Sequence, residues 1–497
     1  MTRPADTRAW AELAGELRAL APNARAMTAD SRKVGPGDVF LAHPGAVHDG
    51  RSHIVQAIQA GAAAVVWEPD GWTWNPDWRA PHLPVAGLRQ GAAHLAAAWY
   101  GAPSEHLWMT GVTGTNGKTS VAQWLAAAWS RLGRPTATIG TVGNGFLDEA
   151  GRFLGADNQA SHTTPDPVTL QGLLARFRDQ GAAGVAMEVS SHGLDQGRVE
   201  GVAFDVAVFT NLSRDHLDYH GDMAAYAAAK SRLFRWPGLQ WAVLNEDDEL
   251  GARLGGELRG GPVQVLGYGF AAGDVLAESC QADRLGLRLE IVTPWGRGRL
   301  TSALLGRFNA YNLLAALGAL LAGGAPLDQA LAVLGQVRPA AGRMQRVPGP
   351  ADAPTVIVDF AHTPDALDKV LAALKPLTPG RLWCVFGCGG GRDTGKRPLM
   401  GAAVAAGADV AIVTSDNPRN EDPMQIIDGI LAGMPPGQTV EPDRRAAIRH
   451  AILAAGPEDI VVLAGKGHED YQEVHGVKHP FSDAEEARLA LTQRSGA

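Results

Sequence analysis

The residues best suited to chemistry lie in a glycine-rich stretch, residues 109–120, which reads MTGVTGTNGKTS. Its glycines let the backbone curl so that several N–H groups point at one anion, and a helix expected from Lys118 adds positive potential. Lys118 would reach the outer phosphates of a nucleotide, and Thr119 would offer its hydroxyl to Mg²⁺. The strict phosphate-loop pattern requires glycine where this chain has Val112, so the alternative is an ordinary glycine turn. The intact Gly-Lys-Thr end, between a strand and a helix, favours nucleotide binding.

Further polar residues follow predicted strands downstream. Glu188 closes the apolar run 184–187, at the strand end where open α/β sheets hold ligands. Its carboxylate could complete Mg²⁺ coordination opposite Thr119, although a solvated glutamate explains the segment equally well. Residues 209–220 hold two histidines, two aspartates and one arginine, a density more typical of a site than of a solvated surface. Lys230, considered alone, is interpreted as an exposed lysine on a helix.

The composition limits the classes of protein to which the chain can belong. Its 497 residues predict three domains at roughly 150 residues each, and its net charge of -8 argues against a general nucleic-acid binder. A single pocket could still be positive and hold an anion. No run of about 18 apolar residues occurs, so we expect no membrane insertion. The first twenty residues read as an amphipathic helix with charges throughout and lack the uninterrupted apolar stretch of a signal peptide. Three cysteines without metal-ligand spacing fit a reducing cytoplasm, which is the expected location.

Apolar runs that alternate with helical stretches predict an α/β protein with mostly parallel sheets and helices on both faces. The predicted strands are residues 38–42, 63–67, 106–110, 184–189, 204–209, 241–244, 355–360, 382–386, 410–414 and 460–464. Residues 69–84, rich in proline and tryptophan, are expected to form a loop, and residues 256–305 an antiparallel insertion. Stop signals at Gly101-Ala-Pro103 and a linker at Val337-Arg-Pro339 mark domain boundaries. The predicted domains are residues 1–103, 104–338 and 339–497.

Five motifs, in order along the chain, resemble those of the Mur ligases, ATP-dependent enzymes that build the peptide of bacterial cell-wall precursors. They are the loop 113–119, Glu188 with Ser-Ser-His-Gly, Asn-Leu-Ser-Arg-Asp-His-Leu-Asp at 211–218, Gly-Arg-Phe-Asn-Ala-Tyr-Asn at 306–312 and Asp-Phe-Ala-His-Thr-Pro at 359–364. This loop is the family's own variant, which accounts for Val112. The resemblance spans essentially the whole chain. It implies a small N-terminal UDP-binding domain, a central P-loop-type ATPase domain and a Rossmann-like C-terminal domain that binds an amino acid.

The resemblance also implies the cofactors and the residues that hold them. ATP is the co-substrate, and its expected contacts are Gly114, Thr115, Asn116, Gly117, Lys118, Thr119, Ser120, Asn309, Arg343 and Asp359. The expected catalytic residues are Lys118, Glu188, His216 and Lys230. The expected Mg²⁺ ligands are Thr119, Glu188, His216 and Lys230, the last as a carbamate formed with CO₂. On this analogy, Lys230 is not the exposed lysine that its local sequence suggests.

Within the family, the chain is similar to the ligase that adds the third residue, a diamino acid, to UDP-N-acetylmuramoyl-L-alanyl-D-glutamate. The positions matching its uridine site are Ser31, Ala46, Val47 and His48. Those matching its muramoyl-dipeptide site are His162, Thr163, Thr164, Ser190, Gln196 and Arg198. These matches imply that the N-terminal and central domains share the nucleotide-sugar substrate. We expect a monomer with no nucleic-acid partner.

The identity of the diamino acid is predicted from charge. The sequence Asp416-Asn417-Pro418-Arg419 matches the signature of ligases that use meso-diaminopimelate, which has a distal carboxylate that lysine lacks. A guanidinium suits a carboxylate, so Arg419 and Arg392 are expected to clamp it. Asp416 and Glu469 could accept the ammonium group, and Gly465 could add a backbone contact. The alternative for Arg419 is a surface arginine in a turn.

The implied reaction transfers the γ-phosphoryl group of ATP to the γ-carboxylate of D-glutamate, and the amine then displaces phosphate from the acyl phosphate. Because three sites on three domains must meet, we expect domain closure. No residue in the sequence stands out as the base that deprotonates the amine. The rival enzymes are a folylpolyglutamate synthetase, which should lack the first domain, and a lysine-adding ligase, which should lack Asp-Asn-Pro-Arg. A nucleotide-dependent switch would make no amide and would not need Arg392 or Arg419.

Overall fold

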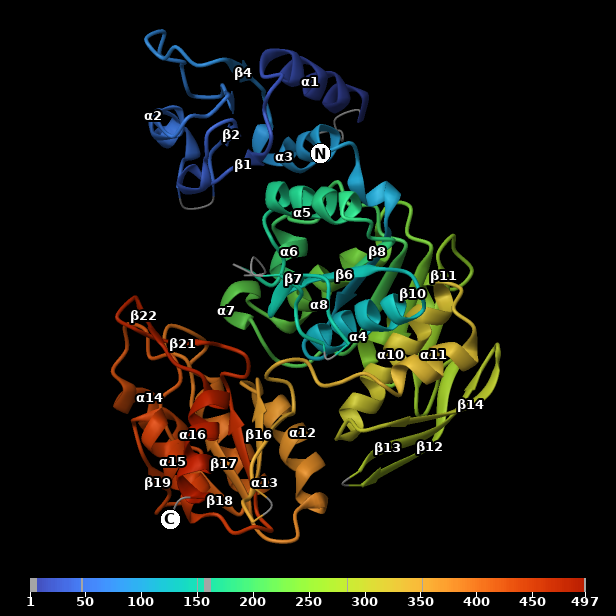
Figure 1. Ribbon diagram of the computed structural model, residues 1–497, viewed down its shortest axis with the longest axis vertical. Coiled ribbons are helices and arrows are strands. Elements are labelled where there is room, and N and C mark those ends of the chain that lie inside the picture. The colour runs from blue at the N-terminus through green and yellow to red at the C-terminus, as the bar shows by residue number, and fades with distance from the viewer. Residues whose placement is uncertain are drawn as a thin grey trace.

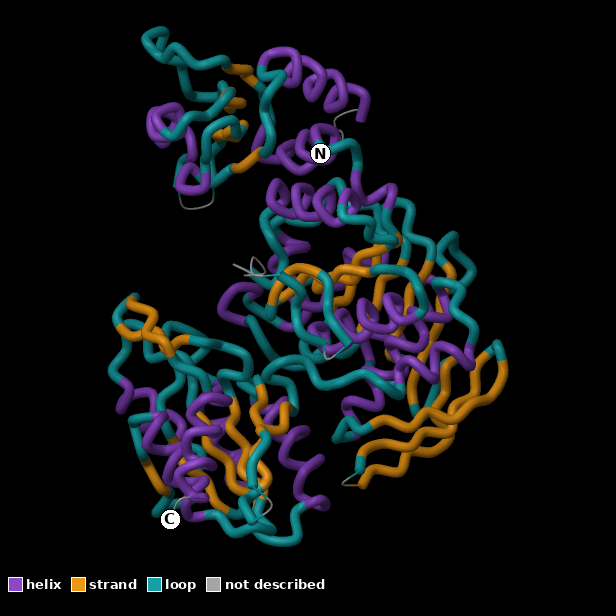
Figure 2. The backbone as a smooth tube through the Cα atoms, viewed as in Figure 1, coloured by secondary structure: helices purple, strands orange, loops and turns teal. Residues whose placement is uncertain are grey.

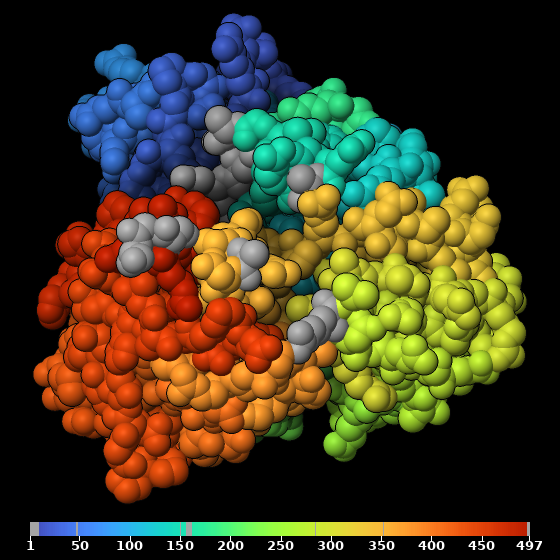
Figure 3. Space-filling view, turned by 60° about the horizontal axis from the view of Figure 1, so that its bottom comes forward, coloured from blue at the N-terminus to red at the C-terminus, as the bar shows by residue number. Residues whose placement is uncertain are grey.

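The computed structural model describes residues 7–45, 48–149, 151–155, 162–283, 285–350 and 352–495. These residues form three α/β lobes, each built on one main sheet (Figure 1). Strands and helices alternate along most of the chain, as the sequence predicts (Figure 2). In the space-filling view the N-terminal, central and C-terminal lobes occupy separate parts of the face shown (Figure 3). No helix among the described residues is long and apolar enough to cross a membrane.

The N-terminal lobe holds a parallel sheet in the order β1-β2-β3-β4. Its strands are β1 Met27–Thr28, β2 Val39–Ala42, β3 Ala64–Trp67 and β4 His82–Pro84, and its helices are α1 Thr7–Leu20, α2 Ile54–Gln59 and α3 Leu88–Trp99. Apolar residues of α1 and α3 pack on one face of the sheet and those of α2 on the other. The expectation of a loop over 69–84 is wrong at its end, because β4 pairs with β3 there. Pro81 precedes this short edge strand and Pro84 ends it, and these prolines hide it from a sequence pattern.

The central lobe is built on a ten-stranded sheet in the order β14-β13-β12-β11-β10-β9-β5-β8-β6-β7. Its strands are β5 Trp108–Thr113, β6 Thr136–Gly140, β7 Gly143–Gly145, β8 Gly184–Glu188, β9 Val206–Phe209, β10 Trp241–Asn245, β11 Gln264–Gly269, β12 Val275–Asp283, β13 Gly286–Thr293 and β14 Gly296–Ser302. Its helices are α4 Lys118–Arg131, α5 Pro167–Asp179, α6 Ser191–Asp195, α7 Leu217–His220, α8 Met223–Ser231, α9 Glu249–Leu258, α10 Arg307–Ala322 and α11 Leu327–Leu334. The strands from β12 to β6 in this order run parallel.

Helices cover both faces of this sheet, as predicted. Residues of α4, α10 and α11 share one buried apolar cluster, and residues of α5, α8 and α9 share the other. The antiparallel pairing expected over 256–305 is present in β12, β13 and β14. The idea that this stretch is a separate insertion is wrong, because β11 pairs in parallel with β10 and the later strands extend the same sheet. Alternating burial marks these strands locally, whereas their place in the sheet depends on long-range pairing.

The C-terminal lobe has a sheet in the order β15-β16-β20-β17-β18-β19, parallel except at β15. Its strands are β15 Gln345–Val347, β16 Thr355–Asp359, β17 Leu382–Phe386, β18 Val410–Val413, β19 Thr439–Val440 and β20 Ile460–Ala464. Its helices are α12 Pro364–Leu374, α13 Lys396–Gly407, α14 Pro423–Leu431, α15 Arg444–Ala454 and α16 Asp483–Ser495. A separate hairpin pairs β21 Tyr471–Val474 with β22 Val477–Pro480. Helices α12, α13 and α14 share one apolar cluster, and α15 and α16 share another.

Candidate active site

The glycine loop lies between β5 and α4, as the sequence predicts. Gly114 has φ 145° and Gly117 has φ 89°, conformations that favour glycine. A Cβ atom on Gly114 would lie 1.9 Å from Thr210 Oγ1, and one on Gly117 would lie 2.3 Å from Asn312 Oδ1. The loop therefore requires glycine at both positions for close approach as well as for backbone angle. The N–H groups of Thr115 and Asn116 donate to Asn211, and the N-terminus of α4 offers the helix N–H groups typical of an anion site.

Lys118, the first residue of α4, turns back over the loop. Its Nζ donates hydrogen bonds to the Gly114 carbonyl at 2.9 Å and the Thr115 carbonyl at 2.8 Å. Burial lowers the pKa of Lys118, while the nearby carboxylates of Glu188 and Asp215 oppose that shift. The ammonium is thus held at the mouth of the loop, where phosphate oxygens can replace the carbonyls as acceptors.

Glu188 and Thr119 meet at the end of the loop, although 69 residues separate them. Thr119 Oγ1 donates to Glu188 Oε2 at 3.0 Å, and the Thr141 backbone N–H donates to Glu188 Oε1 at 2.7 Å. Thr141 Oγ1 lies 3.2 Å from Glu188 Oε2 and 3.0 Å from Thr163 Oγ1. Glu188 is 2% exposed, so the reading of it as a solvated strand-end glutamate is wrong. Arg343, from beyond the central lobe, donates to Thr119 Oγ1 at 3.2 Å.

Lys230 lies in the interior, so its interpretation as an exposed helix lysine is wrong. Only 1% of it is exposed, and its Nζ donates to the Gly114 carbonyl at 2.8 Å, the same oxygen that Lys118 contacts. Its ammonium also lies 4.4 Å from the centre of the Tyr226 ring. Burial, together with the charge of Lys118, lowers the pKa of Lys230 well below its usual value. The sequence could not reveal this, because the carbonyl that accepts from Lys230 is 116 residues away.

His216 has a backbone φ of 54° immediately before α7, which is rare for a residue with a side chain. Its Nε2 lies 3.4 Å from Asp215 Oδ2, and the ring meets His192 edge-on at 4.8 Å. Burial lowers the pKa of His216 to about 3, against the opposing charge of Asp215, so the imidazole is neutral. A neutral imidazole can be a metal ligand.

Mg²⁺ prefers oxygen ligands and keeps several waters. The hydroxyl of Thr119 and the carboxylate of Glu188 form such an oxygen pair beside the loop, and they fit a magnesium ion that also binds phosphate. Within the described chain, no group of three or more histidine, cysteine, aspartate or glutamate residues is placed to hold a metal. Lys230 donates to a carbonyl here, so as an amine it is not a ligand.

Four residues predicted to bind the muramoyl dipeptide lie together at the C-terminal end of β8: Thr164, Ser190, Gln196 and Arg198. Thr164 Oγ1 donates to the Glu188 carbonyl at 2.9 Å, and Ser190 Oγ accepts the Gly193 N–H as the cap of α6. Arg198 donates from Nη1 to the Thr164 carbonyl at 2.9 Å and from Nε to Gln196 Oε1 at 2.9 Å. These contacts place polar groups immediately beside Glu188.

The other predicted substrate residues are distributed differently. Thr163 is linked to Glu188 through the hydroxyl of Thr141, and the adjacent His162 is exposed. Ser31 and His48 lie in the N-terminal lobe, where Ser31 Oγ contacts Gln56 Oε1 at 3.4 Å. Ala46 and Val47 lie outside the described residues. The structure therefore divides the predicted nucleotide-sugar contacts between two lobes.

Arg343 and Asp359 lie where the central and C-terminal lobes meet. Asp359 is buried and accepts backbone N–H groups of Met344 and Ala361 at 2.7 and 2.8 Å. Burial raises the pKa of Asp359, while the charge of Arg343 opposes the shift. The Arg343 guanidinium lies 4.1 Å from the centre of the Phe360 ring. A flat cation on a ring, with a carboxylate beside it, is suited to a nucleotide.

The remaining predicted nucleotide contacts are on the loop and on α10. Asn309 is buried, donates to the Leu305 carbonyl at 2.8 Å and accepts from Asn312 Nδ2 at 3.1 Å. Asn116 Nδ2 donates to Asp365 Oδ2 at 3.2 Å, which ties the loop to the first turn of α12. Thr115 Oγ1 lies 3.2 Å from the Tyr226 hydroxyl, and Ser120 is buried in α4.

The turn at 416–419 follows β18, and it is not a free surface turn. Arg419 has φ 54°, and its backbone is fixed to the hairpin: its N–H donates to the Glu473 carbonyl at 3.0 Å, and its carbonyl accepts from the His475 N–H at 2.7 Å. Its Nη1 donates to the Gly390 carbonyl at 2.7 Å, and Nε lies 3.5 Å from Glu473 Oε2. Arg392 is exposed and makes no hydrogen bond or ion pair within the described residues.

Asp416, Asn417 and Glu469 meet around Lys466, whose role the sequence analysis missed. Asn417 Nδ2 donates to Glu469 Oε2 at 2.8 Å, and Lys466 Nζ donates to the same oxygen at 2.9 Å. A Cβ atom on Gly465, which has φ 116°, would lie 2.9 Å from Asp416 Oδ2. Pro418, within the same turn, is buried. In the sequence, a lysine between two glycines after a strand is typical of a solvated loop. The signal that could have indicated a site is the motif Gly-Lys-Gly-His-Glu at 465–469.

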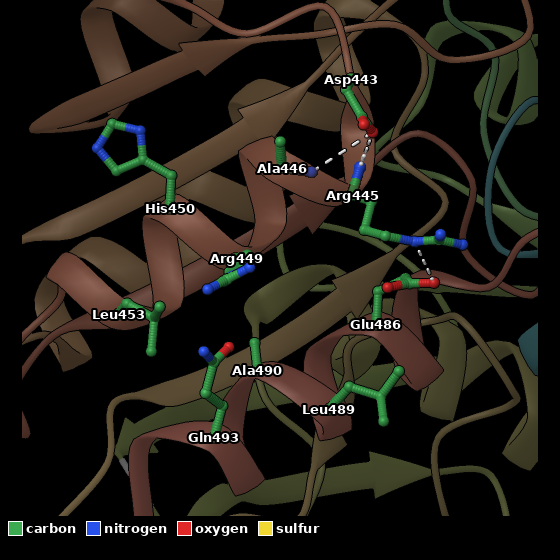
Figure 4. A pocket seen from close by; sticks show the side chains of 10 residues that line it. All are labelled: Asp443, Arg445, Ala446, Arg449, His450, Leu453, Glu486, Leu489, Ala490 and Gln493. Carbon is green, nitrogen blue, oxygen red and sulfur yellow. Dashed lines mark hydrogen bonds and ion pairs between the residues drawn. The ribbon is translucent and has the colours of Figure 1, made fainter. Parts of the chain in front are cut away.

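A separate groove on the C-terminal lobe contains none of the predicted residues. It lies between α15 and α16 and has a volume of about 550 Å³ (Figure 4). Its lining includes exposed Leu453 and Leu489, together with Arg445 paired to Glu486. Nothing in its lining resembles the chemistry of the loop or of the 416–419 turn.

Three family models match the chain. The Mur ligase family catalytic domain matches residues 23–100, the Mur ligase middle domain residues 112–320, and the Mur ligase glutamate ligase domain residues 342–467. A UDP-N-acetylmuramoyl-L-alanyl-D-glutamate–2,6-diaminopimelate ligase of Neisseria meningitidis is 53% identical and covers 95% of both chains. The chain belongs to the Mur ligase family.

Further relatives have the same name as the Neisseria meningitidis enzyme. A UDP-N-acetylmuramoyl-L-alanyl-D-glutamate–2,6-diaminopimelate ligase of Chromobacterium violaceum is 54% identical over 93% of both chains. A solved structure of an enzyme of that name is 38% identical, covers 95% of both chains and has a TM-score of 0.65. The three-lobed α/β fold expected from the sequence is therefore confirmed by a relative of the same length.

Proposed function

We propose that this Mur ligase joins meso-diaminopimelate to UDP-N-acetylmuramoyl-L-alanyl-D-glutamate and converts ATP to ADP and phosphate, in the synthesis of peptidoglycan precursors. The observation that carries the proposal is the identity of more than half of the residues, over nearly the full length, to relatives named for that reaction. We assign the two substrates that define it to the phosphate loop and to the Asp-Asn-Pro-Arg turn, whose first three residues are buried. The free cysteines, Cys280, Cys384 and Cys388, suit a reducing compartment, and we place the enzyme in the cytoplasm.

The reaction proceeds through an acyl phosphate. The γ-carboxylate oxygen of D-glutamate attacks the γ-phosphorus of ATP, and the bond to the ADP oxygen breaks. The uncharged amine of diaminopimelate then attacks the acyl carbon, loses its proton, and phosphate leaves with the C–O bonding pair. Lys118 and the loop N–H groups neutralise the charge that gathers on the phosphoryl oxygens. Bound Mg²⁺ would add to this neutralisation, with Thr119 and Glu188 as its protein ligands.

We assign the substrates to the lobes as follows. Residues 1–103, with Ser31 and His48, hold the uridine end, and residues 104–338 hold ATP and the dipeptide. Residues 339–497 deliver the amino acid. Support for this division comes from the position of Thr164 and Arg198 beside Glu188, because the D-glutamate carboxylate must lie next to the γ-phosphate.

We assign the distal carboxylate of diaminopimelate to Arg419. Its Nη1 is occupied by the Gly390 carbonyl and its Nε faces Glu473, so Nη2 is the edge left for a ligand within the described residues. Arg392, exposed and unpaired within the same residues, can swing onto the same carboxylate. Lysine offers no carboxylate there, so this arrangement favours diaminopimelate.

The test is a substrate comparison with the purified enzyme. UDP-muramoyl dipeptide and ATP are supplied with meso-diaminopimelate or L-lysine, and ADP and the mass of the product are measured. We expect the tripeptide with diaminopimelate and at least about a hundredfold lower kcat/KM with lysine, because lysine has no carboxylate to accept from the partly buried Arg419 guanidinium. ATP hydrolysis without an amide product would contradict the proposal.

A matched variant tests the clamp. Arg419→Ala should lower kcat/KM for diaminopimelate by about a hundredfold or more and bring it close to that for lysine. Arg381→Ala, an exposed arginine on the same lobe, is the control and should leave the ratio of the two substrates unchanged. If Arg419→Ala discriminates as well as the parent enzyme, the clamp is wrong.

A further inference from the structure

Lys466 is a buried cation to which the proposed reaction gives no role. It follows β20 between Gly465 and Gly467, and its side chain is 0% exposed. A buried ammonium is costly unless several acceptors surround it. Its acceptors all belong to residues predicted to bind the amino acid.

Three oxygen atoms surround the Lys466 ammonium. Its Nζ donates to Glu469 Oε2 at 2.9 Å and to Asn417 Oδ1 at 3.1 Å, and it lies 3.7 Å from Asp416 Oδ1. Asp416 is 7% exposed, and the Glu469 side chain is 21% exposed. The cluster itself holds two carboxylates and one ammonium, and two guanidiniums act on Glu469 from outside it: Arg343 and Arg444, the latter paired with Asp483.

These contacts also fix the orientation of the Asn417 amide. Asn417 Oδ1 accepts from Lys466 Nζ and from the Glu473 backbone N–H, the latter at 2.9 Å. The amide nitrogen is thereby turned to Glu469 Oε2, to which it donates at 2.8 Å. A reversed amide would place its NH₂ group against two donors, so the Lys466 charge selects this orientation.

One oxygen of Glu469 is thereby saturated and the other is left open. Oε2 accepts from both Lys466 and Asn417, whereas Oε1 has no hydrogen bond within the described part of the chain. Because the Glu469 side chain is partly exposed, Oε1 can accept from a ligand. Removal of the Lys466 charge would leave Asp416 and Glu469 to repel each other and would free Glu469 to rotate.

We propose that Lys466 is a positioning residue for the amino-acid substrate: it holds Glu469 with one oxygen directed at the substrate ammonium and cancels one of the two negative charges beside it. The inference rests on the proposed function for the identity of the substrate. It adds a residue that does not touch the substrate and sets the affinity of the site through Glu469.

The test replaces Lys466 with an apolar side chain of similar length. Lys466→Met should raise KM for diaminopimelate about ten- to a hundredfold, the loss expected for a hydrogen bond to a charged group. KM for ATP and for UDP-muramoyl dipeptide should stay within about twofold, and kcat should change little, because the lost contact acts in substrate binding. Lys375→Met removes an exposed lysine from the same lobe and should leave all three KM values unchanged.

A double-mutant cycle separates positioning from a general structural effect. Glu469→Gln removes the group through which Lys466 acts, so adding Lys466→Met to Glu469→Gln should raise KM for diaminopimelate by less than about threefold. The double variant also lacks one of the carboxylates that Lys466 pairs with, and it provides the comparison if Lys466→Met alone does not fold.

The outcomes distinguish this inference from the proposed function. A parent enzyme that makes no tripeptide contradicts the function. A parent enzyme that makes tripeptide while Lys466→Met keeps its KM for diaminopimelate overturns the inference alone. Full multiplicative effects in the double variant, or an equal rise in KM for all three substrates, overturn it as well.

Discussion

Two lysines share one carbonyl oxygen at the phosphate loop. Both Lys118 and Lys230 donate to the Gly114 carbonyl, at 2.9 and 2.8 Å, although they belong to different helices. The carboxylates of Glu188 and Asp215 both favour the charged form of Lys118. For Lys230, the favouring carboxylate is that of Asp215. This concentration of positive charge on a chain of net charge -8 is suited to a polyphosphate.

The first prediction concerns Lys230. If it becomes a carbamate, an ammonium is converted to an anion beside Lys118, which relieves the repulsion between the two groups. Lys230→Ala should lower kcat by about a hundredfold or more, and added acetate or formate should restore part of it by supplying a carboxylate in the space left by the side chain. Labelled bicarbonate should give a carbamate ¹³C signal in the parent enzyme that is missing from the variant.

Lys375→Ala serves as the control, because Lys375 is exposed and pairs with Asp409. Its activity should equal that of the parent enzyme with or without acetate. Full activity of Lys230→Ala in the absence of any added acid would contradict the carbamate hypothesis. Loss of activity with no carbamate signal in the parent enzyme would leave Lys230 as a cationic ligand of phosphate instead.

At the scale of single residues, the sequence predicts the site residues that lie close together in one short motif. The glycines, Lys118 and Thr119 occur within one turn, so their spacing alone indicates a phosphate site. Three other features depend on contacts with residues far along the chain. They are the burial of Lys230, the hydrogen bond of Thr141 to Glu188, and the contact of Lys466 with Asn417. A single sequence has no local pattern for such contacts.

Among the elements, the ends of two strands carry the residues that we propose as the amino-acid site. The turn at 416–419 follows β18, and Gly465–Glu469 follows β20, with β17 between them in the sheet. Arg444, the first residue of α15, braces both ends, because its guanidinium donates to the Ser415 carbonyl at 3.4 Å and the Ala464 carbonyl at 2.9 Å. Asp483, at the start of α16, pairs with Arg444 through two hydrogen bonds of 2.7 Å.

The second prediction follows from that buried pair. Both side chains are 0% exposed, so Asp483→Ala leaves an unpaired guanidinium in the interior. We expect the free energy of unfolding of the C-terminal lobe to fall by about 3–5 kcal/mol. Hydrogen exchange of the backbone amides of β17 and β20 in increasing denaturant measures this change, since both strands lie in the core of the same lobe.

The neighbouring pair of Arg445 and Glu486 is a matched control. It joins the same two helices at 2.9 Å, with Arg445 largely exposed to solvent at the groove between them (Figure 4). Arg445→Ala should cost under about 1 kcal/mol, the range for exposed pairs. Equal costs for the two variants would show that burial does not set the value of the Arg444 pair.

The elements could be predicted where a continuous apolar run is buried and could not where no apolar face is present. The buried parallel strands are such runs, and their expected ranges hold to within about two residues at most ends. The hairpin of β21 and β22 was missed because β22 is exposed along its whole length and presents no apolar face. Yet this hairpin holds the backbone of Arg419, so an element without a sequence signal positions a predicted residue.

At the scale of the whole molecule, the lobes meet through both apolar and polar contacts. Val168 of α5 belongs to the apolar cluster of the N-terminal lobe, and Leu305 and Phe308 pack against an apolar cluster of the C-terminal lobe. Arg343 contacts Thr119, Asn116 contacts Asp365, and Arg214 lies 3.5 Å from Asp393, all between the central and C-terminal parts. Arg178 of α5 donates to the Tyr100 carbonyl of the N-terminal lobe at 2.9 Å. Lobes of one chain joined by such mixed interfaces are expected to move relative to one another.

The third prediction is that substrates draw the lobes together. We assign the nucleotide-sugar contacts to the N-terminal and central lobes and the amino-acid contacts to the C-terminal lobe (Figure 1). On this assignment the γ-phosphate, the D-glutamate carboxylate and the amine are held by different lobes and must meet, so bound substrates gain contacts only when the lobes approach. Small-angle scattering should therefore show a smaller radius of gyration with UDP-muramoyl dipeptide, a non-hydrolysable ATP analogue and diaminopimelate than without ligands.

Arg419→Ala tells which ligand completes this closure. The variant keeps the nucleotide and dipeptide residues but loses the contact of the C-terminal lobe with the diaminopimelate carboxylate. Its radius of gyration should fall with the ATP analogue and UDP-muramoyl dipeptide, and the addition of diaminopimelate should then cause no further decrease. In the parent enzyme that last addition should cause a further decrease, because differential contacts are what shift a conformational equilibrium. A radius that stays constant in the parent enzyme at saturating concentrations of all three ligands would show that the lobes already have their catalytic arrangement, and Arg392 would then have to reach the substrate by side-chain rotation alone.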